Sequence, residues 1–259
     1  MQRLDNAALT ELVNGAGLDI KAKSISPMSS PSTNNVFKIE SENGTFILKH
    51  FLNTDVLPVN RTKQYDLQSI SHGLQLAPRP LWLSNDNKWM IEQYVVPGGA
   101  VPSISILAKT LSNIHQHTAV GYELEIVDKW QAYCECLEET LPLRQALNQM
   151  IDRWQAIQKR LGVEHVLCHN DLQFVHLTGL NNVCLDWEYA GHHCRFFDIC
   201  CCIKINSLSQ QQSNQLLSEY AKLSDLSKAY LTGAIEDIMP FAVYTSDLWS
   251  AVVNLSRDN

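Results

Sequence analysis

The sequence has no long hydrophobic run, no excess of basic residues and no apolar N-terminal core. Its apolar segments all fall short of the roughly 20 residues that a membrane-spanning helix needs, and residues 1–17 lack the pattern of a signal peptide. We therefore expect a cytoplasmic protein without a membrane segment. The formal net charge is −7, and no basic stripe stands out. A nucleic-acid partner is not expected, because binding a phosphate backbone needs a clustered basic face.

The eight cysteines lack the C-x-x-C spacing of a zinc module. Three of them are consecutive, from Cys200 to Cys202, and adjacent cysteines rarely bridge each other. In a reducing cytosol, such thiols behave as small hydrophobic side chains. We interpret them as core residues rather than as metal or redox groups.

The N-terminal part carries β-strand patterns. Apolar spacing first predicts a short helix that ends at Gly15. The segment NVFKIESENGTFILKHF, residues 35–51, alternates on both sides of an Asn-Gly pair, which is a strong hairpin signal. A helical segment then stops near Gly73, and residues 80–96 have the pattern of two further strands around a polar turn.

From about residue 103 the periodicity becomes helical. The segments 103–117, 125–141 and 143–161 carry apolar residues at three- and four-residue spacing. Two short apolar runs, at 164–172 and 182–188, interrupt this pattern and predict a two-strand insert. Three further helices are expected after them.

Together these patterns predict an α+β chain of two lobes. A small β-rich lobe would occupy residues 1–95, and a larger, mainly helical lobe would occupy residues 96–259. The segment VPGGAVP, residues 96–102, is interpreted as the hinge because of its prolines and glycines. In such a bilobal arrangement the ligand site is expected between the lobes.

One stretch, CHNDLQFVHL at 168–177, places several polar residues in a buried apolar run. Buried polar groups are costly without partners, so the stretch indicates a structural network or a chemical task. HNDL, LDWEYAG and FFDIC follow one another in the order seen in the aminoglycoside phosphotransferase and choline kinase superfamily. The chain resembles this superfamily, in particular its choline/ethanolamine and thiamine kinase branch, over roughly residues 20–200. The resemblance implies a protein-kinase-like fold, and residues 169–198 are its specific part.

The resemblance also implies transfer of the γ-phosphate of ATP, with Mg²⁺, to the hydroxyl of a small alcohol. Asp171 would orient the acceptor hydroxyl and take its proton, while His169 would lock the loop. Asp186 would bind magnesium, because hard cations prefer carboxylate oxygen. Asp198 would hold the loop backbone from the following helix, the alternative being a helix cap or a surface charge.

In the β-rich lobe, the resemblance assigns contacts with the nucleotide. Lys49 matches the kinase lysine at the α- and β-phosphates, although a lysine at a strand end is usually a solvated edge charge. Glu92 and Tyr94 lie where such kinases link their lobes, and the backbone there would meet adenine. Without the fold analogy, this segment is simply a core strand.

Two features favour a positively charged acceptor. Glu188 adds a carboxylate to the site, and aromatic faces attract quaternary ammonium groups. The aromatic candidates are Trp187, Tyr244 and Trp249, for which packing in the core is the alternative. Choline, ethanolamine, thiamine and aminoglycosides all remain candidate acceptors, and the oligomeric state is left open.

Three positions depart from the family pattern. His176 replaces the magnesium-binding Asn five residues after Asp171; as a metal contact it suits zinc or copper better than magnesium. The loop SPMSSPSTNN, residues 26–35, has no glycine where a nucleotide-covering loop has several. Gln64 or Asp66 stands where a helix Glu would pair with the lysine. The alternative to an active kinase is therefore a pseudokinase that binds ligand with weak or no turnover.

A metal-dependent hydrolase is a more remote alternative. Such a site needs three or four converging ligands, and no spacing here matches H-E-x-x-H. The adjacent histidines after YAG are expected in an exposed loop. The candidate ligands would be His165, His169, Asp171, His176, Asp186, His192 and His193.

Overall fold

The computed structural model describes residues 5–28, 34–52, 59–97, 103–118, 120–162, 164–178 and 182–258. These residues fall into two compact units. The first holds residues 5–52 and 60–96, and the second holds Val59 together with residues 97–258. No helix among the described residues is both long and apolar enough to cross a membrane.

The first unit is built on a five-stranded antiparallel sheet with the strand order β1-β2-β3-β5-β4. The predicted hairpin is confirmed, because Ser41 pairs with Gly44 across its turn. Gly44 has a φ of +136°, a backbone conformation that favours glycine. The strands are β1 (Ala22–Met28), β2 (Asn34–Ser41), β3 (Gly44–Phe51), β4 (Pro80–Leu83) and β5 (Trp89–Gln93).

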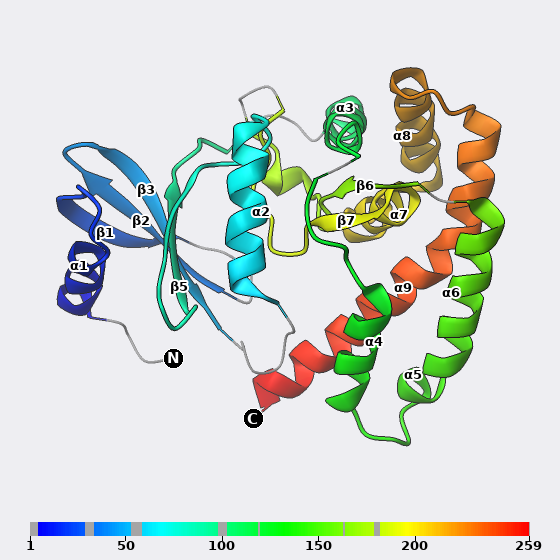
Figure 1. The fold of residues 1–259 in the computed structure, drawn as a ribbon, viewed down its shortest axis with the longest axis horizontal. Helices are drawn as coiled ribbons and strands as arrows, with labels where there is room; N and C mark the ends of the chain where they lie inside the picture. Colours follow the sequence, from blue (N-terminus) through cyan, green and yellow to red (C-terminus); the bar gives the residue numbers. More distant parts are fainter. Residues whose placement is uncertain are drawn as a thin grey trace. The chain divides into compact units, whose positions relative to one another are not determined.

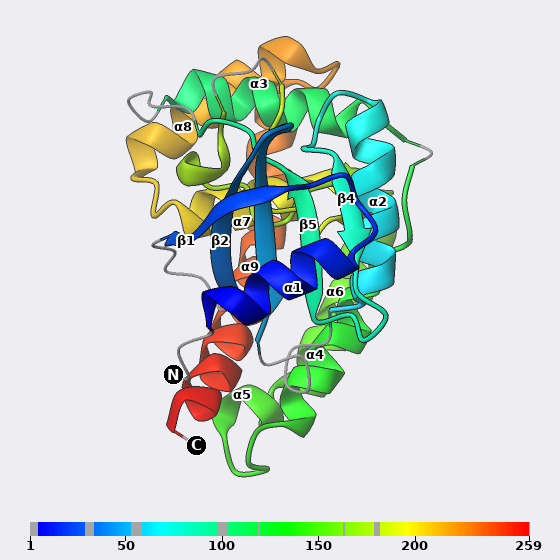
Figure 2. The same ribbon diagram turned by 90° about the vertical axis from the view of Figure 1, so that its left-hand side faces the viewer.

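Two helices cover this sheet on opposite sides (Figures 1 and 2). α1 (Asn6–Gly15) is capped by Asp5 and ends where the sequence predicts. Its buried Leu9 and Val13 pack into an apolar cluster with side chains of β1, β2, β3 and β5. α2 (Arg61–Gly73) runs beside β4. The helices thereby exclude water from the apolar side chains of the sheet, which stabilises the fold.

The second unit is mainly helical, as expected. α7 packs along α9, and α3 packs along α8. Its three consecutive cysteines lie on α7 and are all buried, which fits small core side chains. The helices are α3 (Ile104–His115), α4 (Ile126–Glu135), α5 (Pro142–Gln145), α6 (Leu147–Leu161), α7 (Arg195–Ile205), α8 (Gln210–Leu223) and α9 (Lys228–Asp258).

The two-stranded sheet of this unit differs from the expected insert. β6 (His165–Cys168) pairs antiparallel with β7 (Gly191–Cys194), so the expected second strand at 182–188 is wrong. Within that stretch Asp186 has a φ of +66°, a left-handed conformation that interrupts an extended strand. The chain therefore turns there and reaches β6 only at residue 191.

The adjacent histidines lie in β7, so their expected position in an exposed loop is also wrong. His193 is only 1% exposed. Its ring stacks on Trp154 at a centroid distance of 5.6 Å and meets Phe197 edge-on. His192 is half-buried. Successive side chains of a strand point to opposite faces, which explains the different surroundings of the two rings.

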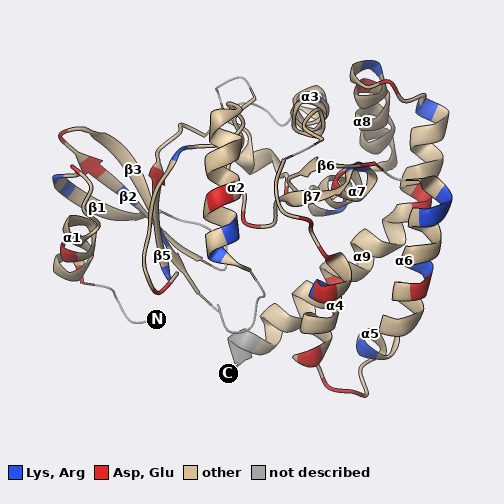
Figure 3. Cartoon of the chain, in the orientation of Figure 1, with Lys and Arg blue, Asp and Glu red and all other residues tan. Residues whose placement is uncertain are grey.

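Charges of both signs are interspersed along α6 and the helices beside it (Figure 3). Arg195 forms an ion pair with Glu164 at 3.0 Å, and Lys222 pairs with Glu219 at 2.9 Å. Such exposed pairs add little stability, typically below about 1 kcal/mol. Packing of the apolar helix faces therefore stabilises this unit far more than its surface charges.

Candidate functional site

The HNDL motif begins where β6 ends, and the chain turns sharply there. Asn170 has a φ of +61°, a conformation that Asn and Asp tolerate better than other residues with a side chain. Its amide nitrogen donates to the carbonyl oxygen of Tyr189 at 3.0 Å. The left-handed turn ends the strand and redirects the chain at Asp171.

Both ring nitrogens of His169 hold this turn together. Nε2 lies 2.9 Å from the carbonyl oxygen of Leu185, and the N–H of Asp171 donates to Nδ1 at 3.3 Å. These partners fix a neutral ring with its hydrogen on Nε2. Burial, assisted by the neighbouring His176, lowers the pKa of His169 to about 4. The ring thus ties two chain segments together, and both nitrogens are already engaged.

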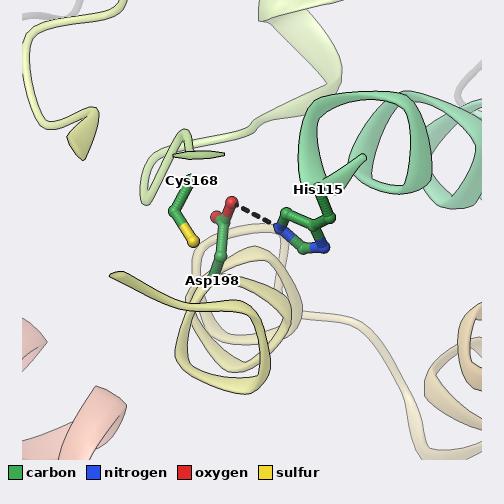
Figure 4. A group of neighbouring side chains, drawn as sticks. All are labelled: His115, Cys168 and Asp198. Carbon is green, nitrogen blue, oxygen red and sulfur yellow. Dashed lines mark hydrogen bonds and ion pairs between the residues drawn. The ribbon is translucent and has the colours of Figure 1, made fainter. Parts of the chain in front are cut away.

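Asp198 of α7 accepts hydrogen bonds from the same turn. Its carboxylate receives the N–H groups of His169 at 2.7 Å and Asn170 at 2.8 Å. Nε2 of His115 lies 3.0 Å from the same carboxylate (Figure 4). Burial by itself would raise the pKa of Asp198, but the hydrogen bond from His115, with the donors of the turn, lowers it below its usual range.

His115 and Tyr220 extend this network and were not found from the sequence. The Tyr220 hydroxyl lies 2.8 Å from Nδ1 of His115. Because Nε2 faces the carboxylate of Asp198, Nδ1 is the atom that accepts the tyrosine hydrogen. His115 follows the buried Ile114 on a helix with apolar spacing. A histidine on such a helix is the sequence signal that could have indicated a buried polar partner.

Cys168 stands beside Asp198 and His115 in Figure 4. The three residues offer possible metal-ligand atoms within 4.8 Å of one another. Burial raises the pKa of the Cys168 thiol well above its usual range, and its sulfur donates to the carbonyl oxygen of His193 at 3.4 Å. Since the other two side chains are hydrogen-bonded as described, the group is a buried hydrogen-bond network.

Asp171, His176 and Asp186 form a second convergent group. One possible ligand atom of each lies within 4.8 Å of the others. Nδ1 of His176 lies 2.8 Å from the backbone carbonyl oxygen of Asp171, so Nδ1 carries a hydrogen and Nε2 faces the two carboxylates. Two carboxylates and an imidazole fit a divalent cation, and the carboxylates suit magnesium.

Negative charge is concentrated around Asp171. Burial, followed by the carboxylates of Asp186, Glu188 and Asp198, raises the pKa of Asp171 well above its usual range. The amide nitrogen of Gln173 donates to Asp171 Oδ1 at 3.1 Å and offsets part of this effect. Carboxylates crowded in this way favour the binding of cations.

The chain after Asp171 is held from α7 by Asn206, another residue not found from the sequence. Its amide nitrogen donates to the carbonyl oxygen of Leu172 at 2.9 Å. Its amide oxygen accepts the N–H of Phe174, also at 2.9 Å. These two bonds fix the segment between the HNDL motif and His176. This segment joins Asp171 to His176, two members of the convergent group.

The aromatic candidates divide into interior and partly exposed residues. Trp187 is fully buried, and its indole N–H donates to the carbonyl oxygen of Cys184 at 2.9 Å. Tyr244 is 6% exposed, and its hydroxyl donates to the carbonyl oxygen of Leu143 at 2.9 Å. These two side chains therefore belong to the core, and direct cation contacts are not supported for them.

Trp249 is only half-buried, and its indole N–H donates to the hydroxyl of Tyr189 at 3.0 Å. Tyr189 follows Glu188 in the chain, and the charge of Glu188 contributes after burial to a raised pKa of the Tyr189 hydroxyl. Tyr189 was not predicted. Together these three residues place a carboxylate beside two aromatic rings.

In the first unit, Lys49 pairs with a residue of the neighbouring strand. Its Nζ lies 3.1 Å from Oε1 of Glu92, and both side chains are almost fully buried. The amide nitrogen of Gln68 on α2 donates to the other carboxylate oxygen at 2.7 Å. Gln64, one of the two expected helix partners, instead accepts a hydrogen bond from Arg61 at 2.8 Å.

The expected adenine contact at Glu92 is not supported by its place in the sheet. Glu92 lies opposite Ile47 of β3 on one side and Pro80 of β4 on the other, so neighbouring strands flank its backbone. The strand ends just after it, and the N–H of Tyr94 donates to the carbonyl oxygen of Thr45 at 3.3 Å. Half of the glycine-free loop, at 29–33, and most of the predicted hinge, at 98–102, lie outside the described residues.

The histidines considered for a hydrolase do not form one site. His176 belongs to the group with Asp171 and Asp186, while His165 and His192 gather around Glu123. Within the described part of the chain, His193 joins neither group. The ligands that a single hydrolase centre would need are therefore divided between two places.

Solved structures with the same fold include several small-molecule kinases. Choline kinase LicA from Streptococcus pneumoniae is 17% identical, with a TM-score of 0.68 over 96% of this chain and 97% of the other. A choline/ethanolamine kinase family protein from Mesorhizobium loti is 16% identical, with a TM-score of 0.72 over 97% and 88%. APH(2")-IIa, in a ternary complex with streptomycin and ATP, is 16% identical, with a TM-score of 0.64 over 100% and 98%.

Sequence comparison agrees with the fold. No curated protein sequence matches this chain, but residues 24–231 match the phosphotransferase enzyme family (APH). The matched region includes Lys49 and the whole segment from HNDL to Asp198. The chain therefore belongs to the phosphotransferase enzyme family.

Proposed function

We propose that this phosphotransferase moves the γ-phosphate of ATP to the hydroxyl group of a small, cationic alcohol. The observation that carries the proposal is the convergence of Asp171, His176 and Asp186 within 4.8 Å of one another. Phosphoryl transfer needs positioned groups and neutralised charge rather than covalent chemistry by the protein. Two carboxylates and an imidazole at the end of a tightly held turn supply such positioning.

In the proposed reaction, Asp171 orients the acceptor hydroxyl and takes its proton. The acceptor oxygen forms the new bond to the γ-phosphorus, and the bond from that phosphorus to the oxygen shared with the β-phosphate breaks. A pKa raised by burial and by Asp186 makes Asp171 a stronger base than an exposed aspartate. Asp186 and His176 would hold the divalent cation, whose charge stabilises the phosphates when it is bound.

The cationic acceptor is proposed from the charge around Asp171 and from the aromatic residue that follows Glu188, together with the ring that contacts it. Glu188 provides a carboxylate, and the half-buried Tyr189 and Trp249 provide aromatic surfaces that favour a quaternary ammonium or a similar cation. The family match and the kinases of the same fold support this acceptor class. Lys49 would contact the α- and β-phosphates, and the residues after β5, from Tyr94 to Val96, would meet adenine.

A pseudokinase is the second candidate, because His176 stands at the position of a magnesium-binding Asn. Imidazole is a weaker magnesium ligand than an amide or carboxylate oxygen. The helix also carries Gln64 or Asp66 where the family has the Glu that pairs with this lysine. Such a chain would bind nucleotide with little transfer.

The test is release of ADP from ATP with Mg²⁺ in the presence of choline, ethanolamine, thiamine or an aminoglycoside. We expect one acceptor class to stimulate ADP release, and Asp171→Ala to abolish that stimulation. Stimulation that survives Asp171→Ala would contradict the assignment of this residue. If no acceptor stimulates release, direct titration with ATP decides whether the chain binds nucleotide as a pseudokinase.

A further inference from the structure

Two histidines share one carboxylate at the β6–β7 sheet, outside the Asp171–His176–Asp186 group. Glu123 directs Oε1 at Nδ1 of His165 and Oε2 at Nδ1 of His192, the latter at 3.0 Å. Possible ligand atoms of the three residues all lie within 4.8 Å of one another. The proposed phosphotransfer reaction gives none of these three residues a role.

The sheet register places the two histidines on one face. His165 lies opposite Cys194, and His192 lies opposite Leu167. Residues two apart on a strand point to the same side, so the two histidines are diagonal neighbours. Their ring centroids are 5.9 Å apart. The pairing of β6 with β7 therefore fixes their separation independently of Glu123.

Backbone hydrogen bonds bring Glu123 to this face. The N–H of His192 donates to the carbonyl oxygen of Tyr122 at 2.7 Å, and the N–H of Leu124 donates to that of His192 at 3.0 Å. Gly191 allows this close approach, because a Cβ atom there would lie 2.9 Å from Cβ of Leu124. The segment carrying Glu123 is thus locked against β7.

His192 is held so that its Nδ1 needs a cation. Its Nε2 lies 2.7 Å from the carbonyl oxygen of Thr118, so Nε2 carries a hydrogen and donates it. In a neutral ring, Nδ1 then directs a lone pair at the carboxylate of Glu123, and two electron-rich atoms at 3.0 Å repel each other. A proton or a metal ion between them removes the repulsion. Metal-binding histidines commonly donate their other N–H to a backbone carbonyl in this way.

We propose that Glu123, His165 and His192 bind one Zn²⁺ ion through the carboxylate and the two Nδ1 atoms. Two histidines and one glutamate, with water in the fourth position, form a known zinc donor set. Zinc bonds of about 2.0–2.2 Å place tetrahedral ligand atoms roughly 3.4 Å apart. The Nδ1 of His192 and the carboxylate oxygen, now at 3.0 Å, need only a small shift.

Three converging ligands and access to solvent support a zinc ion at this place. A proton on each Nδ1 accounts for both contacts in the absence of metal, and zinc that binds the two nitrogen lone pairs replaces these protons. The side chains of Glu123, His165 and His192 are 42%, 29% and 23% exposed, so an ion can enter from solution. Bound there, zinc links the segment before α4 to both strands of the sheet and stabilises the second unit.

The experiment is a zinc titration of the tag-free, full-length protein after treatment with a chelator. We expect one tightly bound equivalent and a higher Tm with zinc than without it. Glu123→Gln and His192→Gln should each weaken zinc binding by more than roughly 100-fold, since changes behind the ligands already cost 10- to 100-fold. Both variants should also lose the rise in Tm.

Two control variants keep the site assignment specific. His117→Gln changes a histidine of the same connecting segment whose ring lies outside the cluster, and it should bind zinc like the parent. Asp186→Asn disrupts the Asp171–His176–Asp186 group and should keep the tight equivalent. With Co²⁺ as the probe, an absorption spectrum without a sulfur-to-cobalt band is expected, because no cysteine belongs to the cluster.

Three results would overturn the proposal: no stoichiometric zinc in the parent, unchanged zinc binding in both Glu123→Gln and His192→Gln, or a sulfur-to-cobalt band that tracks the tight equivalent. Far-UV circular dichroism checks that the variants fold. If His192→Gln does not fold, the more exposed Glu123→Gln decides the question by itself. Zinc binding is measured without ATP or acceptor, so its outcome does not depend on the phosphotransfer reaction.

Discussion

Nε2 of His176 lies 3.8 Å from a carboxylate oxygen of Asp186, while Nδ1 of the same ring lies 2.8 Å from the carbonyl oxygen of Asp171. The second contact fixes the ring so that Nδ1 donates to the backbone and Nε2 faces the carboxylate. We propose that a histidine held in this way shares a divalent cation with Asp186. Because nitrogen ligands favour later transition metals over magnesium, this relationship bears directly on metal choice.

We predict that His176→Asn changes the preferred metal. The amide oxygen of Asn is a better magnesium ligand than imidazole, so activity with Mg²⁺ should rise and the ratio of activity with Mn²⁺ to that with Mg²⁺ should fall. The measurement is acceptor-stimulated ADP release with each metal. A clear loss of activity with both metals would mean that His176 has a role that Asn cannot replace.

The two aspartates of the group should affect different steps. Asp171→Ala should reduce turnover by roughly 10²- to 10⁴-fold, the usual size of a general-base contribution, while ATP binding persists. Asp186→Ala should weaken the magnesium-dependent binding of ATP. Isothermal titration with ATP, with and without Mg²⁺, separates these effects. Equal loss of ATP affinity in both variants would contradict the separate roles.

His115 should be required for the position of the HNDL turn, although it is far from the motif in the chain. In His115→Phe, the buried carboxylate of Asp198 loses a donor, which costs roughly 2–4 kcal/mol of unfolding free energy. Tyr220→Phe removes the hydroxyl that contacts the other ring nitrogen and Arg195, and it should cost about 1 kcal/mol. Chemical denaturation of the parent and both variants measures these costs. Equal costs would show that the contact with Asp198 is not the important one.

The hairpin, most helices and the pairing of Asp171 with Asp186 could be predicted from the sequence, because local patterns determine them. Alternating residues around Asn43–Gly44 predict the hairpin, and helical spacing predicts α3 and the later helices. The motifs HNDL and LDWEYAG, in this order, indicate the family and so predict that Asp171 and Asp186 lie in one site, as they do. In each of these cases the information lies within a few residues or within a motif.

The remaining features depend on contacts that no local pattern encodes. His115 meets Asp198 from a helix 83 residues earlier in the chain, and Asn206 meets the loop after Asp171 from the end of α7. The predicted strand partner of β6 was wrong because Asp186 adopts a left-handed conformation. Asp tolerates this conformation, so no glycine marks the turn in the sequence. Likewise, the pairing of Lys49 with Glu92 joins two strands that are not neighbours in the sequence.

The Lys49–Glu92 pair should show strong coupling in stability. Both side chains are almost fully buried, and removing one partner of a buried pair leaves a charge without compensation, which costs roughly 3–5 kcal/mol. We expect Glu92→Leu to be strongly destabilising and the double variant Lys49→Met/Glu92→Leu to recover much of the loss. A double-mutant cycle by urea unfolding measures the coupling. Additive losses would show that the two charges act independently.

His193 should make the stability of the protein depend on pH. Neither of its ring nitrogens has a hydrogen-bond partner among the described residues. Burial, helped by the charge of His165, lowers the pKa of His193 from 6.5 to about 3. Below pH 6.5, His193 is therefore protonated in the unfolded chain but stays neutral in the folded chain. The free energy of unfolding should therefore decrease as the pH is lowered below 6.5, and this one residue contributes about 1.4 kcal/mol per pH unit.

The variant His193→Leu isolates this effect. It removes the proton that the unfolded state takes up at this position. The slope of the unfolding free energy against pH, between pH 6 and pH 4.5, should therefore correspond to about one proton fewer than in the parent. Comparison with the parent at pH 8, where the histidine is neutral in both states, gives the cost of lost packing against Trp154. Urea unfolding across the pH range supplies both numbers. Parallel pH profiles for parent and variant would show that the ring is protonated in the folded protein, contrary to its burial beside Trp154 and Phe197.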